Sequence, residues 1–108
     1  MATPELITSL FDVNVSSFPA IEFGAHLHST KETIADKVLA SLKGGCKRFD
    51  GALKGYGGCP MAKDELVGNM ATELMIETLE HAGENLNLNK TELIEAMKLA
   101  NYVFNPVS

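Results

Sequence analysis

The spacing of apolar residues along the chain predicts four amphipathic helices. The first begins at Thr3-Pro4, with the threonine as cap and the proline at the first helical position, and it should stop before Pro19. Ser29 or Thr30 can cap a second helix, which should end at Gly44-Gly45. The apolar residues that recur at helical spacing are Leu6, Leu10 and Val13 in the first helix and Ile34, Val38 and Leu42 in the second.

Two further helices are predicted in the second half of the chain. Asn69 or Thr72 should begin the third, which Gly83 closes. Asn89 and Glu92 have the spacing of a capping box, with asparagine in the usual Ser/Thr place, before the final helix. The apolar residues of these helices are Met75, Ile76 and Leu79, followed by Leu93, Ile94, Met97, Ala100 and Phe104.

Two short apolar segments between the helices predict strands. Residues 21–25 lead into His26, and residues 46–53 precede a glycine-rich loop. The alternation with helices predicts that these strands are parallel and belong to a larger sheet. Reactive residues of such sheets gather at the carboxyl ends of the strands. We therefore expect the histidines and the glycine-rich loop to share one edge, where a (β/α)₈ barrel carries its active site.

Composition narrows the class of protein. The 108 residues suit one small domain, and 45% apolar with 21% charged residues is typical of a soluble globular chain. A net charge of −5 without clustered lysine and arginine argues against nucleic acid as a partner. No apolar run is long enough for a membrane span, and the start lacks the features of a signal peptide. Two cysteines without zinc or disulfide spacing indicate a reduced, cytoplasmic compartment.

Three side chains are candidate metal ligands. His26 and His28, two residues apart at a strand end, point to the same side, and neutral imidazole binds divalent metals. The alternative is a pair of polar residues facing solvent. Asn69 could provide an oxygen ligand or cap the third helix. Such an oxygen and nitrogen set favours Mg²⁺ or Mn²⁺ over a thiolate-rich zinc site.

Cys59 is the candidate reactive thiol. It lies among small residues in a loop that could close over a site and bring the thiol to a substrate for proton transfer, although the glycines could also only form a turn. The absence of a following Gly-Lys-Ser or Gly-Lys-Thr excludes a P-loop. Cys46 is expected to be packed within the second strand. His81 should have a surface role at a helix end, and Glu73 could support Asn69 by hydrogen bonding.

Three motifs in this order carry a family resemblance: His26-Leu27-His28, Gly55-Tyr56-Gly57-Gly58-Cys59-Pro60 and Gly68-Asn69-Met70-Ala71-Thr72-Glu73. With them the chain resembles hydroxymethylglutaryl-CoA lyase, a branch of the metal-dependent lyase and synthase barrels. The resemblance implies that His26, His28 and Asn69 bind a divalent cation, Mg²⁺ or Mn²⁺, and that Cys59 is catalytic, with His26 acting beside it.

The implied reaction is cleavage of 3-hydroxy-3-methylglutaryl-CoA to acetoacetate and acetyl-CoA. The metal would acidify and orient the tertiary hydroxyl, a base would take its proton, and the departing acetyl-CoA enolate would be protonated. The expected partner is therefore an acyl-CoA substrate. A homo-oligomer is also expected, through exposed strand edges or as a dimer of the parent enzyme.

Three departures from the family pattern are visible. Ser29-Thr30 follows the histidine pair where the family has Asp-Thr, and residues 61–67 are more charged than the family loop. The family's first-strand Asp-Arg-Asp-Gly motif, with its metal-binding aspartate and catalytic arginine, is absent. Because the family barrel has eight strands, residues 1–108 are expected to be an α/β, C-terminal portion of a (β/α)₈ TIM barrel.

That portion would run from the sixth helix to the C-terminus, with about two parallel strands and four helices, and would lack the first six strands. Met1 would then be a cloned start, and the chain alone would be inactive. Two alternatives are a non-enzymatic truncated α/β module that self-associates, and a fragment of a related acyl-CoA aldolase or synthase.

Overall fold

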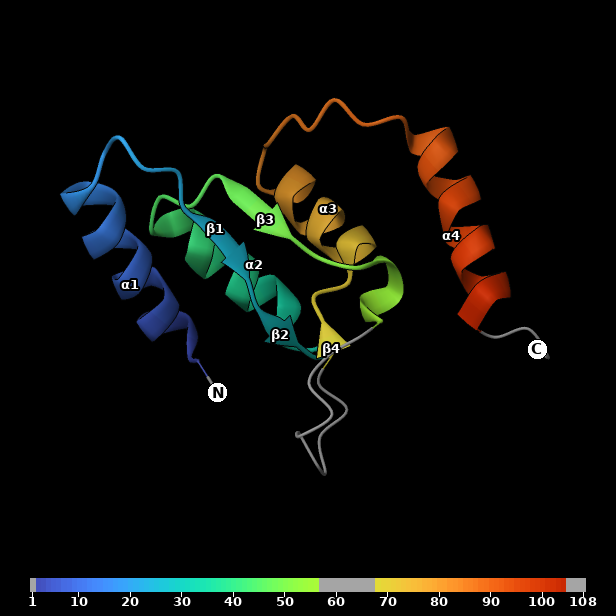
Figure 1. Ribbon diagram of the computed structural model, residues 1–108, viewed down its shortest axis with the longest axis horizontal. Coiled ribbons are helices and arrows are strands. Elements are labelled where there is room, and N and C mark those ends of the chain that lie inside the picture. The colour runs from blue at the N-terminus through green and yellow to red at the C-terminus, as the bar shows by residue number, and fades with distance from the viewer. Residues whose placement is uncertain (1, 57–67, 105–108) are drawn as a thin grey trace.

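The computed structural model describes residues 2–56 and 68–104, which form helices and short strands (Figure 1). The helices are α1 (Pro4–Ser17), α2 (Ile34–Lys43), α3 (Thr72–His81) and α4 (Lys90–Phe104). The strands are β1 (Gly24–His26), β2 (His28–Ser29), β3 (Arg48–Asp50) and β4 (Gly68–Asn69), and a single 3₁₀ turn, η1, spans Leu53–Gly55.

The predicted parallel strands are present. β1 pairs with β3 in parallel, and His26 lies opposite Asp50 in the register. α2 makes the crossover between them and lies behind the pair in Figure 1, whereas no described element crosses the front of the two strands. Helices therefore cover one face of this sheet and leave the other open.

Side chains of residues 24–29 alternate between these two faces. Ala25 and Ser29 are buried, and Leu27 packs against the core. His26 is exposed and His28 is half-buried. This period of two is that of an extended strand, and it sends the two imidazoles to the face away from α2.

A second, antiparallel pair was not predicted. β2 pairs with β4, with His28 opposite Asn69. Ala52, which follows β3, donates from its N–H to Met70 O (3.0 Å) and accepts from the N–H of Thr72 (2.9 Å). These bonds join the chain after β3 to the residues that follow β4.

The core lies between α2, α3 and the strands. Met70 and Val38 are fully enclosed, with no exposed surface. The remaining buried members of the cluster are Ile34, Met75 and Leu79, and the partly buried side chains around it are Leu27, Leu42, Phe49, Ala71, Leu74 and Leu86.

The predicted ends of three helices are confirmed. The N–H of Leu6 donates to Thr3 Oγ1 (3.2 Å) at the start of α1. The N–H of Glu92 donates to Asn89 Oδ1 (3.1 Å) at the start of α4. Gly83 follows α3 with φ of +92°, a left-handed conformation that glycine adopts without strain.

The predicted start of the second helix was wrong. Thr33, rather than Ser29 or Thr30, precedes α2. Ser29 instead belongs to β2, and the N–H of Thr30 donates to Thr33 Oγ1 (3.0 Å) in the turn between strand and helix. Ser29, which the local sequence suggests as a helix cap, is therefore used in the strand pairing with β4.

Both predicted strands were too long. The first begins only at Gly24, after an exposed Ile21, and the second ends at Asp50. Gly51 then approaches Met70 so closely that a Cβ would lie 2.7 Å from the Met70 carbonyl oxygen. Cys46, predicted within the strand, lies before β3, although its packing is confirmed by an exposure of 0%.

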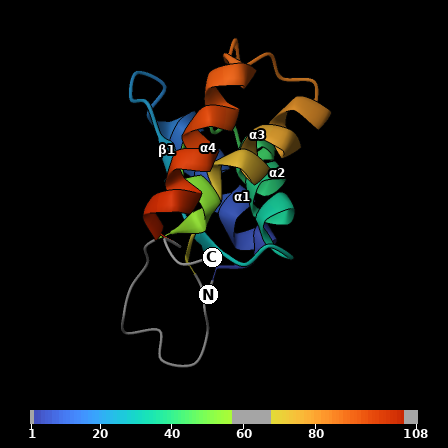
Figure 2. The ribbon, with the colours of Figure 1, turned by 90° about the vertical axis from the view of Figure 1, so that its right-hand side faces the viewer.

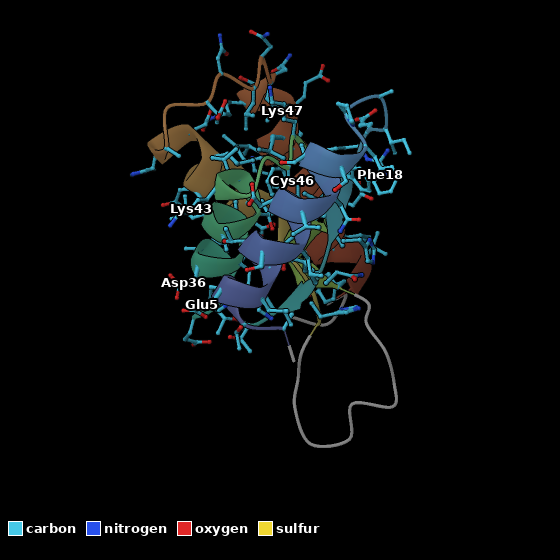
Figure 3. The ribbon with its side chains drawn as sticks, turned by 90° about the vertical axis from the view of Figure 1, so that its left-hand side faces the viewer. Glu5, Phe18, Asp36, Lys43, Cys46 and Lys47 are labelled. Carbon is cyan, nitrogen blue, oxygen red and sulfur yellow. The ribbon has the colours of Figure 1, made fainter. Side chains whose placement is uncertain are left out.

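The peripheral helices are less enclosed. α1 packs on α2, as Figure 3 shows from the side where Glu5, Asp36 and Lys43 are labelled. Its buried residue is Ile7, while the stripe of Leu6, Leu10 and Val13 is exposed. In Figure 2, α4 stands in front of the other elements, and it contacts the η1 turn. No helix within residues 2–56 and 68–104 combines the length and apolar character that crossing a membrane requires.

Candidate active site

The two predicted histidines lie close together on the open face. The ring centroids of His26 and His28 are 5.9 Å apart, with the rings nearly perpendicular at 86°. An ion between rings at this separation could contact one nitrogen of each. The structure thus supports the predicted direction of both side chains.

The ring of His28 is held by a main-chain carbonyl. Nδ1 lies 3.3 Å from the oxygen of Gly68, the residue before Asn69. A carbonyl oxygen can only accept, so a hydrogen bond here requires the proton on Nδ1, and in the neutral imidazole the lone pair is then on Nε2. Metal-binding histidines commonly use this arrangement, in which one nitrogen donates to a carbonyl and the other binds the ion.

Asn69 stands opposite His28 across the β2–β4 pair. Its Nδ2 donates to the carbonyl oxygen of Tyr56 (3.1 Å), which joins the two ends of segment 56–69. This bond orients the amide, whose Oδ1 is the atom that a cation would bind. The alternative role as a helix cap is wrong, because Ala71 precedes α3 and no side chain caps it.

A buried lysine lies on the other side of His28. Lys37 of α2 is only 4% exposed, and its Nζ donates to His28 O (2.7 Å). Burial disfavours the charged amine and lowers the pKa of Lys37. Sequence reasoning missed this residue. The available signal was its position beside Ile34 and Val38 on the apolar face of the helix.

Glu73 does not support Asn69 as predicted. Its carboxylate accepts from the N–H of Lys54 (2.8 Å), whose φ of +59° is unusual for a residue with a side chain. Lys54 Nζ donates in turn to Asn101 Oδ1 (2.7 Å) on α4. Glu73 therefore stabilises the η1 turn that precedes the glycine-rich loop.

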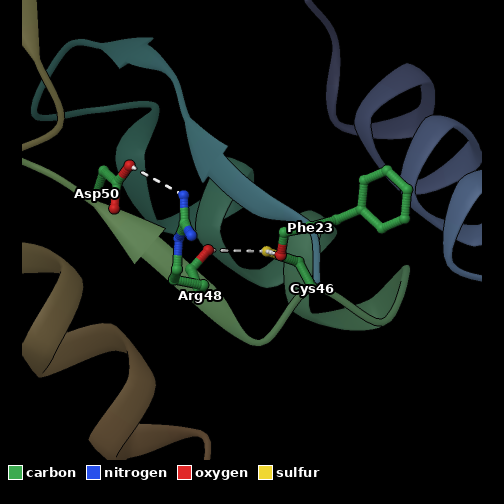
Figure 4. Close-up of polar contacts among 4 residues, drawn as sticks. All are labelled: Phe23, Cys46, Arg48 and Asp50. Carbon is green, nitrogen blue, oxygen red and sulfur yellow. Dashed lines mark hydrogen bonds and ion pairs between the residues drawn. The ribbon is translucent and has the colours of Figure 1, made fainter. Parts of the chain in front are cut away.

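Cys46 has a structural environment (Figure 4). Its Sγ donates to Arg48 O (3.0 Å), and the Phe23 carbonyl oxygen lies 3.8 Å away. Burial raises the pKa of the Cys46 thiol, so the thiolate needed for reactivity is disfavoured. Arg48 also forms an ion pair with Asp50 (3.9 Å) across half-exposed surface.

The predictions for His81 and Cys59 differ in whether the described residues include them. His81 is the exposed last residue of α3, in agreement with a surface role. Cys59 lies outside the described residues, so its predicted place near His26 stays a prediction.

His28 lies opposite Asn69 across the β2–β4 pair, and the His26 ring lies beside that of His28, so three of the predicted donors share one sheet edge. Within residues 2–56 and 68–104, no three side chains of histidine, cysteine, aspartate and glutamate gather closely enough to hold an ion. The two imidazoles and the Asn69 amide oxygen fit a cation that accepts nitrogen and neutral oxygen donors. Further ligands, including any carboxylate, would have to come from elsewhere.

Comparisons with known proteins agree with this arrangement. No protein-family model matches the sequence. The chain is 32% identical over 97 residues to a hydroxymethylglutaryl-CoA lyase of Bacillus subtilis, covering 90% of this chain and 32% of that protein. It is also 32% identical over 96 residues to an (R)-citramalyl-CoA lyase of Chloroflexus aurantiacus, covering 89% of this chain and 30% of that protein.

Two solved structures match nearly the whole chain. An HMG-CoA lyase of Acinetobacter baumannii, in complex with coenzyme A and 3-methylmalate, has a TM-score of 0.79 at 30% identity, covering 94% of this chain and 33% of that one. The HMG-CoA lyase of Brucella melitensis has a TM-score of 0.79 at 28% identity, covering 94% and 36%.

The fold is therefore a portion of a TIM barrel, and its described residues include a parallel pair of strands and four helices, as predicted. Sequence and structure together place the chain with the hydroxymethylglutaryl-CoA lyases, which confirms the resemblance seen in its motifs. The chain spans about a third of the length of the curated relatives it matches.

Proposed function

We propose that this chain contributes one part of the active site of a carbon–carbon lyase that acts on a CoA thioester. The observation that carries the proposal is the pairing of His28 with Asn69 at one sheet edge, with His26 on the same open face. The Acinetobacter relative was solved with coenzyme A bound, which supports an acyl-CoA as the substrate class. The first candidate is 3-hydroxy-3-methylglutaryl-CoA, cleaved to acetoacetate and acetyl-CoA.

His26, His28 and Asn69 would bind a divalent cation, Mg²⁺ or Mn²⁺. Such a cation, when bound, supplies the positive charge that makes a substrate hydroxyl more acidic. His28 would present Nε2, since its Nδ1 faces Gly68. His26, the more exposed imidazole, would also exchange a proton with the substrate. Cys59 would take part in the proton transfer that completes acetyl-CoA.

The remaining barrel strands are the proposed partner of the open sheet face. Residues 1–108 would be the C-terminal portion of the barrel, and the lone chain would be inactive because an aspartate ligand and an arginine are missing. The exposed strand edges would favour self-association. We also propose a cytoplasmic location, which differs from that of the relatives from Arabidopsis thaliana and Mus musculus that are named as mitochondrial.

A complementation assay tests this function. The chain would be co-expressed with the part of the Bacillus subtilis lyase that it does not match, and the purified complex would be assayed for acetyl-CoA release with Mn²⁺ present. We expect activity from the complex and none from either part alone. His28→Ala and Cys59→Ala should each remove most of it, because one loses a ligand and the other a proton-transfer group.

Lys43→Ala is the matched control for these variants, because Lys43 is exposed on α2, away from the strand edge. A stable complex that binds Mn²⁺ but does not cleave the thioester would contradict the proposed reaction. Turnover by the lone 108-residue chain would contradict the proposal that its site is incomplete.

A second candidate substrate follows from one comparison. The identity to the (R)-citramalyl-CoA lyase equals that to the Bacillus hydroxymethylglutaryl-CoA lyase. The same complex should therefore be given (R)-citramalyl-CoA in parallel. Faster cleavage of that thioester would favour this second function while leaving the proposed class unchanged.

A further inference from the structure

The environment of Lys37 is unusual for a lysine. Helical lysines generally extend their amine into water, yet this one is 4% exposed and ends within the protein. Among the described residues, the hydrogen bond recorded for its Nζ is to His28 O at 2.7 Å. Burying an ammonium group is costly unless it has a partner. The contact with His28 is therefore the feature of Lys37 that calls for an explanation.

His28 is held from both sides of its strand. From α2, Lys37 binds the main-chain oxygen, and from β4 the Gly68 carbonyl accepts from the ring at 3.3 Å. At 3.3 Å, the second contact is slightly longer than the usual range for an N–H···O bond. A small shift of the His28 backbone away from β4 would break it, and the ring would lose the contact that fixes its proton on Nδ1.

We propose that Lys37 is a positioning residue for His28. By holding the His28 carbonyl, its amine keeps the ring within reach of Gly68, so that Nε2 carries the lone pair that faces outward. Lys37 does not touch the substrate or a cation in this proposal. The inference rests on the proposed function only where it concerns metal binding, since the state of the ring can be measured without metal.

The test uses the full 108-residue chain with ¹⁵N-labelled histidine near pH 8, followed by titration with Mn²⁺ alone. In the wild type, His28 should be protonated on Nδ1, whereas the exposed His81 should favour Nε2 as free imidazole does. Lys37→Met keeps the length and packing of the side chain but removes its donor. We expect His28 to shift toward the Nε2-protonated form and to need about tenfold more Mn²⁺ for the same line broadening.

Two further variants separate positioning from general stability. Lys37→Gln keeps an N–H donor without the charge and should restore part of both effects. Lys43→Met, an exposed lysine on the same helix, should change neither. The unfolding midpoint of Lys37→Met should be unchanged or higher, because a buried amine has been replaced by an apolar group. If Lys37 only stabilised the fold, Lys37→Met would lower the unfolding midpoint and leave the protonation of His28 unchanged.

The outcomes are distinguishable. If the wild-type His26 and His28 respond to Mn²⁺ no more than His81, the proposed metal site is wrong, while the protonation of His28 still decides the role of Lys37. If Lys37→Met leaves that protonation unchanged, the positioning role is wrong. If Lys37→Met does not fold, Lys37→Gln decides: a partial shift of His28 toward the Nε2-protonated form is expected, and a His28 ring protonated as in the wild type overturns the proposal.

Discussion

α2 and α4 are both amphipathic in sequence, but only α2 has its apolar side chains covered by other elements of the described chain. α2 buries Ile34 and Val38 in the core that it forms with the strands and α3. On α4, Ala100 is buried, whereas Ile94, Leu99, Tyr102 and Val103 are more than half exposed. An amphipathic pattern can thus give either a buried or an exposed apolar face, because the periodicity identifies the face but not the element that packs on it.

This difference separates the part of the chain that forms its own hydrophobic core from the part that does not. The α2 and α3 side encloses a core from residues that the chain itself supplies. The exposed apolar residues of α4 and α1 are surfaces that further barrel elements would cover in the proposed parent protein. Substitutions on the two helices should therefore differ in effect although their chemistry is the same.

The largest effect is expected from a matched pair of valines. Val38→Ala on α2 removes two methyl-sized groups from a side chain with 0% exposure and should lower the free energy of unfolding by about 2 to 3 kcal/mol. Val103→Ala on α4, where the side chain is 65% exposed, should change it by no more than about 0.5 kcal/mol. Urea unfolding of both variants measures the contrast. Equal losses would mean that α4 is packed in solution as tightly as α2.

The next effect concerns the contact of α2 with α1. A Cβ at Gly44 would lie 2.7 Å from both Phe11 Cβ and the Thr8 carbonyl oxygen, and the φ of −77° shows that the backbone itself is unstrained. Gly44→Ala should therefore force the helices apart and destabilise the protein by about 1 to 3 kcal/mol.

Thermal unfolding would test this, with the adjacent Lys43→Ala as control because that side chain is exposed. The close approach of α1 would be refuted by a Gly44→Ala variant that melts at or above the wild-type temperature.

The smallest effect is a pH dependence from Cys46, which lies between α2 and β3. Burial raises the pKa of this thiol, so the folded state keeps its proton while the unfolded state begins to ionise near pH 9. The contribution is complete below the unfolded pKa and is lost as pH rises through the folded one. Stability should fall in this range more steeply for the wild type than for Cys46→Ala.

Urea unfolding under reducing conditions at about pH 7 and pH 10 measures the change. The difference between wild type and Cys46→Ala should narrow at the higher pH. A constant difference would show that the thiol ionises alike in both states.

Local sequence was sufficient where structure depends on neighbouring residues. Thr3, Gly83 and Asn89 mark helix ends through contacts within a few positions, and all three were predicted. The β2–β4 pair was not, because it depends on residues such as His28 and Gly68 that are 40 positions apart. Its formation also explains the error at the start of α2.

The candidate site was predictable in part for the same reason. Alternation along the strand placed His26 and His28 on one face, but the antiparallel β2–β4 pair that sets Asn69 opposite His28 was not predicted. Lys37 could not be found this way, because a lysine in a helix is ordinarily assigned to the surface. Its role depends on a carbonyl group, which has no signature in the sequence.

The change of strand partner at Leu27 has a further consequence for the two imidazoles. His26 belongs to the ladder with β3, whereas His28, two positions later, belongs to the ladder with β4. Displacement of Gly68 and Asn69 would therefore reach one ring and leave the other in register. The distance between the two rings therefore reports the position of β4 relative to β3.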